Sequence, residues 1–395
     1  MDHATTGAEL LAAEAARTAG GLPDVQYEAT DGVIDLTWGH PDPSVFAGDD
    51  VAAAAAAVVR DRGWQALTYG APFGAAFTRS AVAALLTRTD APVVADDVII
   101  TGGSSGGLDL LLTVLAVPGD VVFVEQPTYF LALRMFADHG LRIVGLEGDT
   151  EGPLPGAFAA ATALVRAEGR RAFLYLVPTF ANPTGRCMPP ERQLALLAAA
   201  REHGVHVIED DVYRDTSVTA PPSMWSLDHD VLRLGSFSKS LSPGLRIGYL
   251  TADPAMLARI GGCGLLDSGG GVNHFASMVV GELLHSGRFG VIAADGQQRY
   301  AARRAALAAA LDATLFDFHV PDGGYFIWLG LPSGVSAAAA VQAARANGVL
   351  VSNGRNFFVD EPATGAVRVS FSMLDEGLLT EGATRLNAAV AALVR

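Results

Sequence analysis

The stretch SFSKSLSPGLRIGY, residues 236–249, holds the only lysine of the 395-residue chain, Lys239. The chain has 27 lysine and arginine residues, and all of them except Lys239 are arginine. A coding bias toward arginine explains the scarcity of lysine, and a lysine that survives it marks a position that arginine cannot fill. Arginine stays charged, whereas a lysine amine can lose its proton and form an imine with a carbonyl group. Lys239 is therefore a candidate for Schiff-base chemistry.

A glycine-rich turn offers a second chemical feature. TGGSSGGLDLL, residues 101–111, has the pattern of a strand, a turn and the start of a helix. Backbone N–H groups at the helix start, together with Ser104 and Ser105, would suit a phosphate group. The stretch lacks the spacing of a P-loop or of a dinucleotide fingerprint, which disfavours a nucleotide. The alternative is an ordinary turn before a helix.

Two further polar turns follow apolar runs. VIEDDVYRD, residues 207–215, places Asp210 and Asp211 just after an expected strand. A carboxylate in a dry site could keep a cationic ring nitrogen protonated, although paired carboxylates are more often a solvated turn. Asn182 of ANPTG lies on a turn before a helix and could bind a phenol oxygen or form an ordinary Asx turn.

The flanks of the lysine add hydroxyls and a cation. Ser236 and Ser238 precede Lys239, and Arg246 follows within the apolar run LRIGYL. An arginine can bind a phosphate through two hydrogen bonds. The alternative for Arg246 is a surface salt bridge, but its apolar flanks favour a buried anionic partner.

The elements that must position these groups alternate along the chain. Short runs rich in β-branched residues are followed by turns and by stretches with helical period, which predicts an α/β fold with a mostly parallel sheet. The runs are VIIT (98–101), VVFVE (121–125), AFLYLV (172–177), VHVIE (205–209), VLRLG (231–235) and LRIGYL (245–250). The gap between Gly235 and Leu245 is too short for a crossover helix, so this pair should be antiparallel.

A long helix is expected over residues 293–313, as a bridge into a smaller C-terminal domain. That domain would contain the strands GGYFIWLGL (323–331) and VRVSFS (367–372) with a helix between them. Ligands of open α/β sheets bind at the carboxyl ends of the strands, so the polar turns above should converge there.

Composition narrows the class of protein. Hydrophobic residues make up 50% of the chain, which is ample for a large core, and the net charge is −15. An acidic chain argues against nucleic acid or an anionic membrane as a partner. The two cysteines suggest no disulfide framework. The N-terminus has acidic residues and no basic segment before a long apolar core, which argues against a signal peptide, and no apolar run approaches the ~18 residues of a membrane span. The expectation is a soluble cytoplasmic protein.

Taken together, a phosphate cradle, a carboxylate for a pyridinium, an amide for a phenol oxygen and an imine-forming lysine are the requirements of pyridoxal 5'-phosphate (PLP). The combination of NPTG, D-x-x-Y and S-x-S-K-x7-G resembles the fold type I PLP enzymes of the class I/II aminotransferase family, in particular the aromatic and 2-aminoadipate group. The resemblance covers residues from about 30 to 390. It implies a seven-stranded, mostly parallel sheet flanked by helices in a large domain (46–292). A small α+β domain (293–395) and an N-terminal segment (1–45) would pack together.

The resemblance also implies a role for individual residues. Lys239 would form the imine with PLP and later move a proton, while Asp210 and Tyr213 would bind the ring nitrogen and the phenolate oxygen. Arg368 of VRVSFS would hold the α-carboxylate of the substrate, beside Gly39 and Asn182. The other cofactor-binding residues implied are Asn182, Tyr129, which stacks on the ring, the phosphate-binding Ser104, Ser105, Ser236, Ser238 and Arg246, and Tyr69, which reaches the site of a partner subunit. No metal is expected.

Some segments depart from the family pattern. The turn GGSSGG, the segment SNGRNFF and the glycine-rich DSGGGVNHF leave the substrate and even the reaction type open, but not the cofactor. His274 and Asn273 could line the pocket or be structural, and Cys187 is expected to be inert. Trp38 and His40 fall where the N-terminal segment of the family closes over substrate.

The sequence thus predicts a homodimeric, PLP-dependent aminotransferase that moves an amino group from an α-amino acid to a 2-oxo acid by a ping-pong mechanism. One alternative keeps PLP but changes the chemistry to a C–S β-lyase, a decarboxylating enzyme or an oxidative deaminase. The other is a ligand-sensing regulator. Two site assignments have rivals within the chain: Asp211 could replace Asp210, and Arg368 could be a surface arginine paired with an acid.

Overall fold

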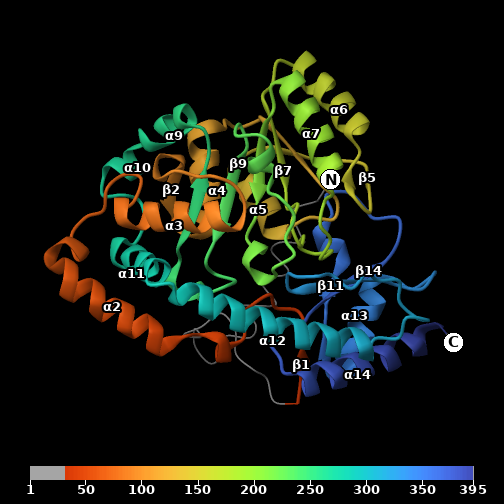
Figure 1. The fold of residues 1–395 in the computed structure, drawn as a ribbon. Helices are drawn as coiled ribbons and strands as arrows, with labels where there is room; N and C mark the ends of the chain where they lie inside the picture. Colours follow the sequence, from red (N-terminus) through yellow and green to blue (C-terminus); the bar gives the residue numbers. More distant parts are fainter. Residues whose placement is uncertain (1–31, 395) are drawn as a thin grey trace.

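The computed structural model describes residues 32–394, and its centre is a seven-stranded sheet (Figure 1). The strand order is β2-β10-β9-β8-β7-β3-β4, and the strands are Val98–Thr101 (β2), Val121–Val124 (β3), Arg142–Gly145 (β4), Ala172–Leu176 (β7), His206–Asp210 (β8), Leu232–Ser236 (β9) and Gly248–Thr251 (β10). Strand β10 runs antiparallel to both of its neighbours, and the other pairs are parallel. The expected sheet type and the antiparallel pair after Gly235 are confirmed.

Helices cover both faces of this sheet, so its strands are apolar on both sides. In β7 every residue is buried: Ala172, Leu174 and Leu176 join one core, whereas Phe173 and Tyr175 join the core on the opposite face. The first core includes Ala76–Thr89 (α3), Pro155–Ala167 (α6), Pro190–His203 (α7), Met224–Leu227 (α8) and His274–His285 (α11). The second includes Gly103–Leu115 (α4), Phe130–Asp138 (α5), Pro254–Gly261 (α9) and Gly264–Asp267 (α10).

A second, antiparallel sheet lies in the C-terminal part of the chain. It has the order β11-β14-β13 and consists of Phe326–Gly330 (β11), Ser352–Asn353 (β13) and Ala366–Ser370 (β14). Ala337–Ala346 (α13) and Glu376–Val394 (α14) pack with it around a third core. The short strand Ile34–Asp35 (β1) pairs in parallel with Val349–Leu350 (β12), which ties the start of the described chain to this part.

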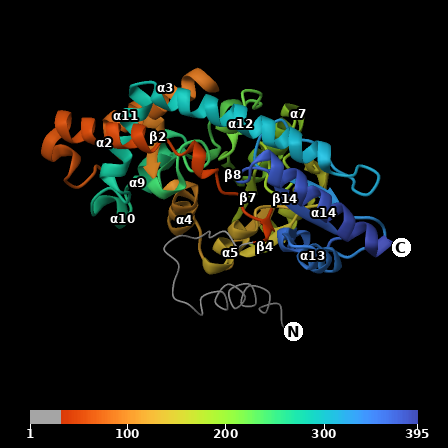
Figure 2. The ribbon, with the colours of Figure 1, turned by 90° about the horizontal axis from the view of Figure 1, so that it is seen from below.

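Helix α12, Arg288–Ala310, connects the two parts (Figures 1 and 2). Phe289 and Ile292 near its start lie in the first core of the large sheet, and Leu307 lies in the C-terminal core. The helix begins before the expected residue 293 and runs through the predicted boundary between the two domains. The division of the chain at residues 46 and 293 stays a prediction, and residues 1–31 of the predicted N-terminal segment lie outside the described residues.

Two strands differ from the sequence-based expectation. Strand β4 was not expected, and it lies at the sheet edge, where its residues are only partly buried and its apolar pattern is weak. The run at 245–250 becomes a strand only from Gly248, because Arg246 adopts a left-handed backbone (φ 53°) after a short 3-10 turn. The remaining elements of residues 32–394 are the helix Gly48–Arg62 (α2), the two-residue strands Gly148–Asp149 (β5) and Gly152–Pro153 (β6), and six 3-10 turns. No helix between residues 32 and 394 combines the length and apolarity needed to cross a membrane.

Candidate active site

Lys239 lies in the turn that follows β9, with its side chain partly buried. Its amine donates a hydrogen bond to the carbonyl of Gly39 (2.7 Å). Burial lowers the pKa of Lys239 to about 8; the positive charges of Arg368 and Arg246 act in the same direction, and Asp210 opposes them. An amine with this pKa is partly uncharged near neutral pH, as a nucleophile must be.

Asp210 is the last residue of β8 and is buried. The hydroxyl of Tyr175 donates a hydrogen bond to its Oδ2 (2.6 Å), whereas its buried Oδ1 has no hydrogen-bond partner within residues 32–394. Burial raises the pKa of Asp210 to about 6, and Asp211 adds to this, while the Tyr175 hydrogen bond and Lys239 act against it. A buried carboxylate oxygen without a donor is an open acceptor site.

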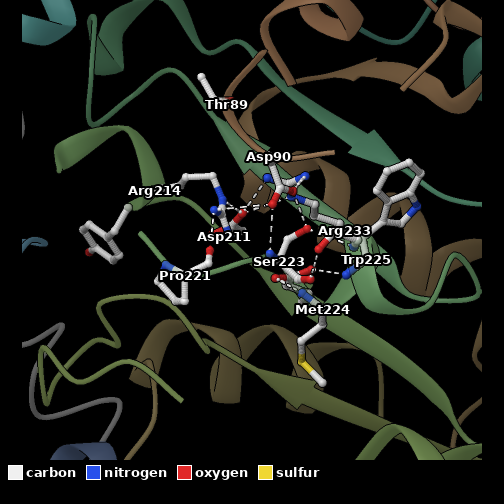
Figure 3. A network of polar contacts seen from close by, with 12 residues as sticks. Thr89, Asp90, Asp211, Arg214, Pro221, Ser223, Met224, Trp225 and Arg233 are labelled. Atoms are coloured by element: carbon white, nitrogen blue, oxygen red, sulfur yellow. Dashed lines mark hydrogen bonds and ion pairs between the residues drawn. The ribbon is translucent and has the colours of Figure 1, made fainter. Parts of the chain in front are cut away.

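Asp211 follows the last residue of β8, and its N–H still donates to the Leu234 carbonyl (2.8 Å), so its side chain continues the alternation and points to the opposite side. It accepts hydrogen bonds from Arg214 Nε (2.6 Å) and Arg233 Nε (3.0 Å) (Figure 3). Arg233 is fully buried and also donates to Asp90 (2.9 Å), which in turn accepts from the N–H of Ser223 (3.1 Å). Asp211 is therefore part of a buried ion-pair network beneath α3 and α8, away from Lys239.

Arg368 lies in β14 and is only 4% exposed. It donates from Nη1 to the side-chain oxygen of Asn182 (2.7 Å) and from Nη2 to the Thr37 carbonyl and the Ser352 hydroxyl (3.1 Å). Its guanidinium carbon lies 3.9 Å from the centre of the Phe326 ring. These contacts fix the plane of the guanidinium group.

No acidic side chain forms an ion pair with Arg368 among the described residues. The alternative of a surface arginine paired with an acid is therefore wrong. Its Nε is buried without a hydrogen-bond acceptor in this part of the chain, and burial lowers the pKa of Arg368 to about 10. A cation with these properties can bind a carboxylate.

Tyr213 and Tyr129 lie close to the same charged groups. Tyr213 is buried, and burial raises its pKa; its side-chain hydrogen bond with Asn182 acts in the opposite direction. Tyr129 directly precedes α5, and burial, followed by the charge of Asp210, raises its pKa to about 12. The structure thus brings both phenols to the group formed by Asp210, Asn182 and Arg368.

The predicted phosphate-binding residues gather at the start of α4, whose first turn has no side-chain cap. Ser236 and Ser238 are buried, and Ser238 lies 3.4 Å from Arg246 Nη1. Gly103 has φ +76°, and a Cβ atom there would lie 2.8 Å from Arg246 Nη2, so a larger residue would collide with the arginine. Ser104 is partly buried and Ser105 is exposed on the first turn of the helix.

The anionic partner predicted for Arg246 stays a prediction, but the expectation that this residue lies within a strand is wrong. It is exposed and occupies the left-handed turn before β10. This turn nevertheless directs its guanidinium to the start of α4, where Nη2 donates to the Gly102 carbonyl (3.3 Å).

Of the two remaining predicted residues, Gly39 lies at the lysine and Tyr69 does not. Gly39 lies directly over the lysine, and a Cβ atom there would come within 2.4 Å of Phe326, so only glycine fits. Tyr69 is 84% exposed on the surface of the single chain and is not brought to Lys239.

Comparison with known proteins agrees with this geometry. Residues 32–386 match the family of aminotransferases of class I and II. The chain belongs to this family. It is 33% identical to the 2-aminoadipate transaminase of Thermus thermophilus, over 92% of this chain and 91% of that protein. It is 30% identical to the aromatic-amino-acid aminotransferase 1 of Thermococcus litoralis, over 90% of this chain and 88% of that protein.

A solved structure extends the similarity to the whole fold. The kynurenine aminotransferase of Pyrococcus horikoshii, in complex with PMP, superposes with a TM-score of 0.87 at 27% sequence identity, over 100% of this chain and 96% of that one. The chain is therefore a PLP-dependent aminotransferase with the type I fold, acting on small amino and oxo acids. The expectations about family, fold, cofactor and enzyme class are confirmed.

The residues of this aminotransferase fit PLP. The partner-free Oδ1 of Asp210 is a suitable acceptor for a protonated ring nitrogen, and Lys239 offers an amine of lowered pKa to the aldehyde. The uncapped first turn of α4, beside Arg246, offers N–H donors and positive charge to the phosphate.

Several other residues of the aminotransferase that the sequence singled out make contacts within the chain. The ring of His274 lies 2.9 Å from the carbonyl of Gln65, and Asn273 caps α11. The Cys187 sulfur accepts from the backbone N–H of Phe180, and burial raises the pKa of its thiol to about 11, as expected for an inert residue. Trp38 and His40 pack edge to face, 5.3 Å apart, on either side of Gly39.

Sequence reasoning missed the residues that support this site of the aminotransferase. Tyr175 holds Asp210, and Tyr325 donates from its hydroxyl to the Lys239 carbonyl (2.5 Å). Both tyrosines interrupt otherwise apolar strand sequences, AFLYLV and GGYFIWLGL, and this was the available signal. The contacts of Thr37 and Ser352 with Arg368 had no signal, because they depend on tertiary structure.

Proposed function

We propose that this aminotransferase binds PLP covalently through Lys239 and uses Asp210, Tyr213, Asn182 and Arg368 to position cofactor and substrate. The observation that carries the proposal is the environment of the single lysine. Its amine lies among the charges of Arg368, Asp210 and Arg246 and has a pKa of about 8. Such a shifted amine in a cluster of opposing charges is typical of a catalytic group.

Each side chain then has a distinct task. PLP, when bound, supplies the electron sink that makes the substrate Cα–H bond acidic. Arg368 holds the α-carboxylate and so fixes the direction of that bond, and Asp210 Oδ1 accepts the hydrogen bond of the ring nitrogen. Tyr213 and Asn182 face the phenol oxygen of the ring. Once the substrate amine has replaced Nζ in the bond to the PLP aldehyde carbon, the freed and uncharged Nζ of Lys239 would take the proton from Cα.

The first experiment locates the covalent bond. Borohydride reduction of the PLP-loaded enzyme, followed by peptide mapping, should find the pyridoxyl label within residues 236–246. A label on the N-terminal amine alone would refute the assignment. Lys239→Ala should abolish turnover, and Lys239→Arg should not restore it, because a guanidinium group does not form the imine.

The reaction type follows from a second experiment. We propose a ping-pong transfer in which the amino group passes from an α-amino acid to the enzyme and then to a 2-oxo acid. With a panel of amino acids as donors, the oxo-acid product should exceed one equivalent per enzyme subunit only when a second 2-oxo acid is added as acceptor. Turnover without an acceptor would favour the β-lyase, decarboxylating or oxidative alternatives.

We propose further that the active enzyme is a homodimer in which Tyr69 reaches the phosphate site of the partner subunit. Three large apolar or aromatic side chains are exposed close together in sequence: Trp64 (74%), Leu67 (66%) and Tyr69 (84%). Exposed clusters of this kind mark protein interfaces. A second copy would bury them.

Mixing two inactive variants tests this dimer. A dimer of Tyr69→Ala with Lys239→Ala has one site with both residues intact, so random mixing should restore about a quarter of the parent activity. No recovery after subunit exchange would place Tyr69 outside the shared site.

We also propose that the enzyme acts in the cytoplasm without nucleic acid. Its two free cysteines and its net charge of −15 support this view.

A further inference from the structure

Tyr175 is a polar residue in a position where the sheet is otherwise apolar. It lies in β7, its side chain is fully buried, and its ring packs edge to face on Phe136 with 5.2 Å between ring centres. Its hydroxyl donates to Asp210 Oδ2 over 2.6 Å. A buried hydroxyl on a rigid strand is a fixed donor, since neither the backbone nor the ring can follow a moving partner.

This bond treats the two oxygens of Asp210 differently. Oδ2 is occupied by Tyr175, and Oδ1 is buried without a partner among the described residues. A carboxylate can rotate about its Cβ–Cγ bond, which would exchange the two oxygens. A donor held by the sheet fixes the plane of the carboxylate, so that one oxygen faces Tyr175 and the other faces away from it and stays free for a ligand.

The same bond decides which charge state of Asp210 is favoured. Besides Tyr175, the titratable and charged groups that act on Asp210 or feel its charge are Asp211, Lys239, Glu125, Tyr129 and Tyr213. Burial and Asp211 favour the neutral acid. The hydroxyl of Tyr175 and the amine of Lys239 favour the carboxylate. A neutral acid could not keep the ring nitrogen of PLP protonated.

We infer that Tyr175 is a positioning residue that keeps Asp210 ionised and aims its Oδ1 at the ring nitrogen of PLP. The inference rests on the proposed role of Asp210 and adds a residue that contacts neither substrate nor cofactor.

The test compares Tyr175→Phe with the matched control Tyr249→Phe. Both tyrosines are buried in the same sheet, but β8 and β9 separate their strands, and Tyr249 of β10 packs on Gly235 and Phe237 rather than on Asp210. Titration of each apoenzyme with PLP should show affinity about tenfold weaker for Tyr175→Phe and unchanged for Tyr249→Phe, because one charge-assisted hydrogen bond is lost. Equal affinities for both variants and the parent would overturn the inference.

A second readout needs no cofactor. Infrared spectra of the apoenzyme follow the carboxylic acid band of Asp210 with pH, and Asp210→Asn identifies that band. The midpoint should move to higher pH in Tyr175→Phe, since the carboxylate has lost a donor, and stay at the parent value in Tyr249→Phe. An unmoved midpoint in Tyr175→Phe would overturn the inference.

The Asp210→Asn variant separates the two proposals. If it binds PLP as tightly as the parent, the role of Asp210 fails and the inference falls with it. If it binds weakly while Tyr175→Phe behaves like the control, only the inference fails. If Tyr175→Phe does not fold, the parent apoenzyme can be prepared with ring-labelled tyrosine. Its infrared spectrum should then show a tyrosine C–O band that shifts at the same pH as the carboxylic acid band of Asp210, and this shift should be absent in Asp210→Asn. Tyrosine bands that are indifferent to Asp210 would refute the inference.

Discussion

Asp210 and Asp211 are neighbours in sequence but belong to two different regions of the sheet end. Asp211 accepts from two arginines in a network that also includes Asp90 and Ser223 (Figure 3). Within the described part of the chain, Asp210 has a single donor, and one of its oxygens is left open. Asp210 ends β8 and Asp211 follows it, so the alternation of side chains places Asp211 in a region that is nearly balanced in charge and Asp210 in a region that is not.

The two regions, the ion-pair network around Asp211 and the site around Asp210, differ in the balance of positive and negative side chains. In the network, Arg214 and Arg233 face Asp90 and Asp211. In the site, Lys239 feels two arginines, Arg246 and Arg368, against the single carboxylate of Asp210. A surplus of positive charge around a buried cation such as Arg368 is unfavourable unless an anion is bound there. In the proposed function, the PLP phosphate and the substrate carboxylate would supply that missing charge, within a chain whose net charge is −15.

The sharpest way to break this comparison is to neutralise each carboxylate in turn. Asp210→Asn should lower kcat by about 10²–10³-fold, by analogy with other pre-organised groups, because an amide cannot keep the ring nitrogen protonated. Asp211→Asn should retain most of its activity and lose folding stability instead. Steady-state kinetics and urea denaturation of both variants measure the two effects. A silent Asp210→Asn beside an inactive Asp211→Asn would show that the two residues exchange roles.

Removing a cation tests the network itself. Arg233 is fully buried between Asp211 and Asp90, so Arg233→Met should lower the free energy of unfolding by about 3–5 kcal/mol, since two buried carboxylates lose their partner. Arg299→Met, which breaks the solvent-exposed pair with Asp295, is the matched control and should change stability little. Equal stabilities of the two variants would mean that the network is dispensable.

Arg368→Lys sharpens the comparison on the side of the site. A lysine keeps the charge but cannot form two parallel hydrogen bonds, so kcat/KM for amino acids should fall by about ten- to a hundredfold. PLP binding and the cofactor absorption band should be unchanged. The loss should be smaller for simple amines, which have no carboxylate to bind. Parent-like kinetics with amino acids would remove Arg368 from the substrate site.

The smallest effect concerns the pH at which Lys239 loses its proton. Its lowered pKa of about 8 means that reaction of the apoenzyme with an aldehyde, trapped by borohydride, should rise with pH and level off above about 8. Arg368→Gln removes a positive charge that lowers this pKa, so its midpoint should lie at higher pH than the parent midpoint. Asp210→Asn should move it to lower pH. Peptide mapping separates Lys239 from the N-terminal amine, and a parent midpoint near 10 would contradict the burial argument.

Much of this arrangement could be predicted from the sequence, where the signal is local. The β-branched runs marked six of the seven strands, and the turns after them marked Ser104, Asn182, Asp210 and Lys239. Strand β4 escaped because an edge strand carries a weaker apolar pattern. The apolar flanks of Arg246 were misleading, because a left-handed turn stands where a strand was expected.

The supporting contacts could not be predicted in the same way. The alternation in VRVSFS could not show whether Arg368 is buried or exposed, since its side of the strand could face either a cleft or water. Its partners Thr37, Asn182 and Ser352 come from three separate segments. Such contacts depend on the packing of the whole chain, which no local pattern encodes.

The pairing of β1 with β12 brings the start of the described chain to its C-terminal part, and this has a consequence for how the protein is synthesised. Thr37, next to β1, contacts Arg368 across 331 residues of sequence, and Gly39 contacts Lys239 across 200. Contacts of such separation form late, because the intervening chain must first be ordered. On the ribosome, the earliest of these residues must therefore wait for almost the last ones to be made. A nascent chain that ends before β14 has no complete site, so it cannot act on amino acids before synthesis is nearly finished.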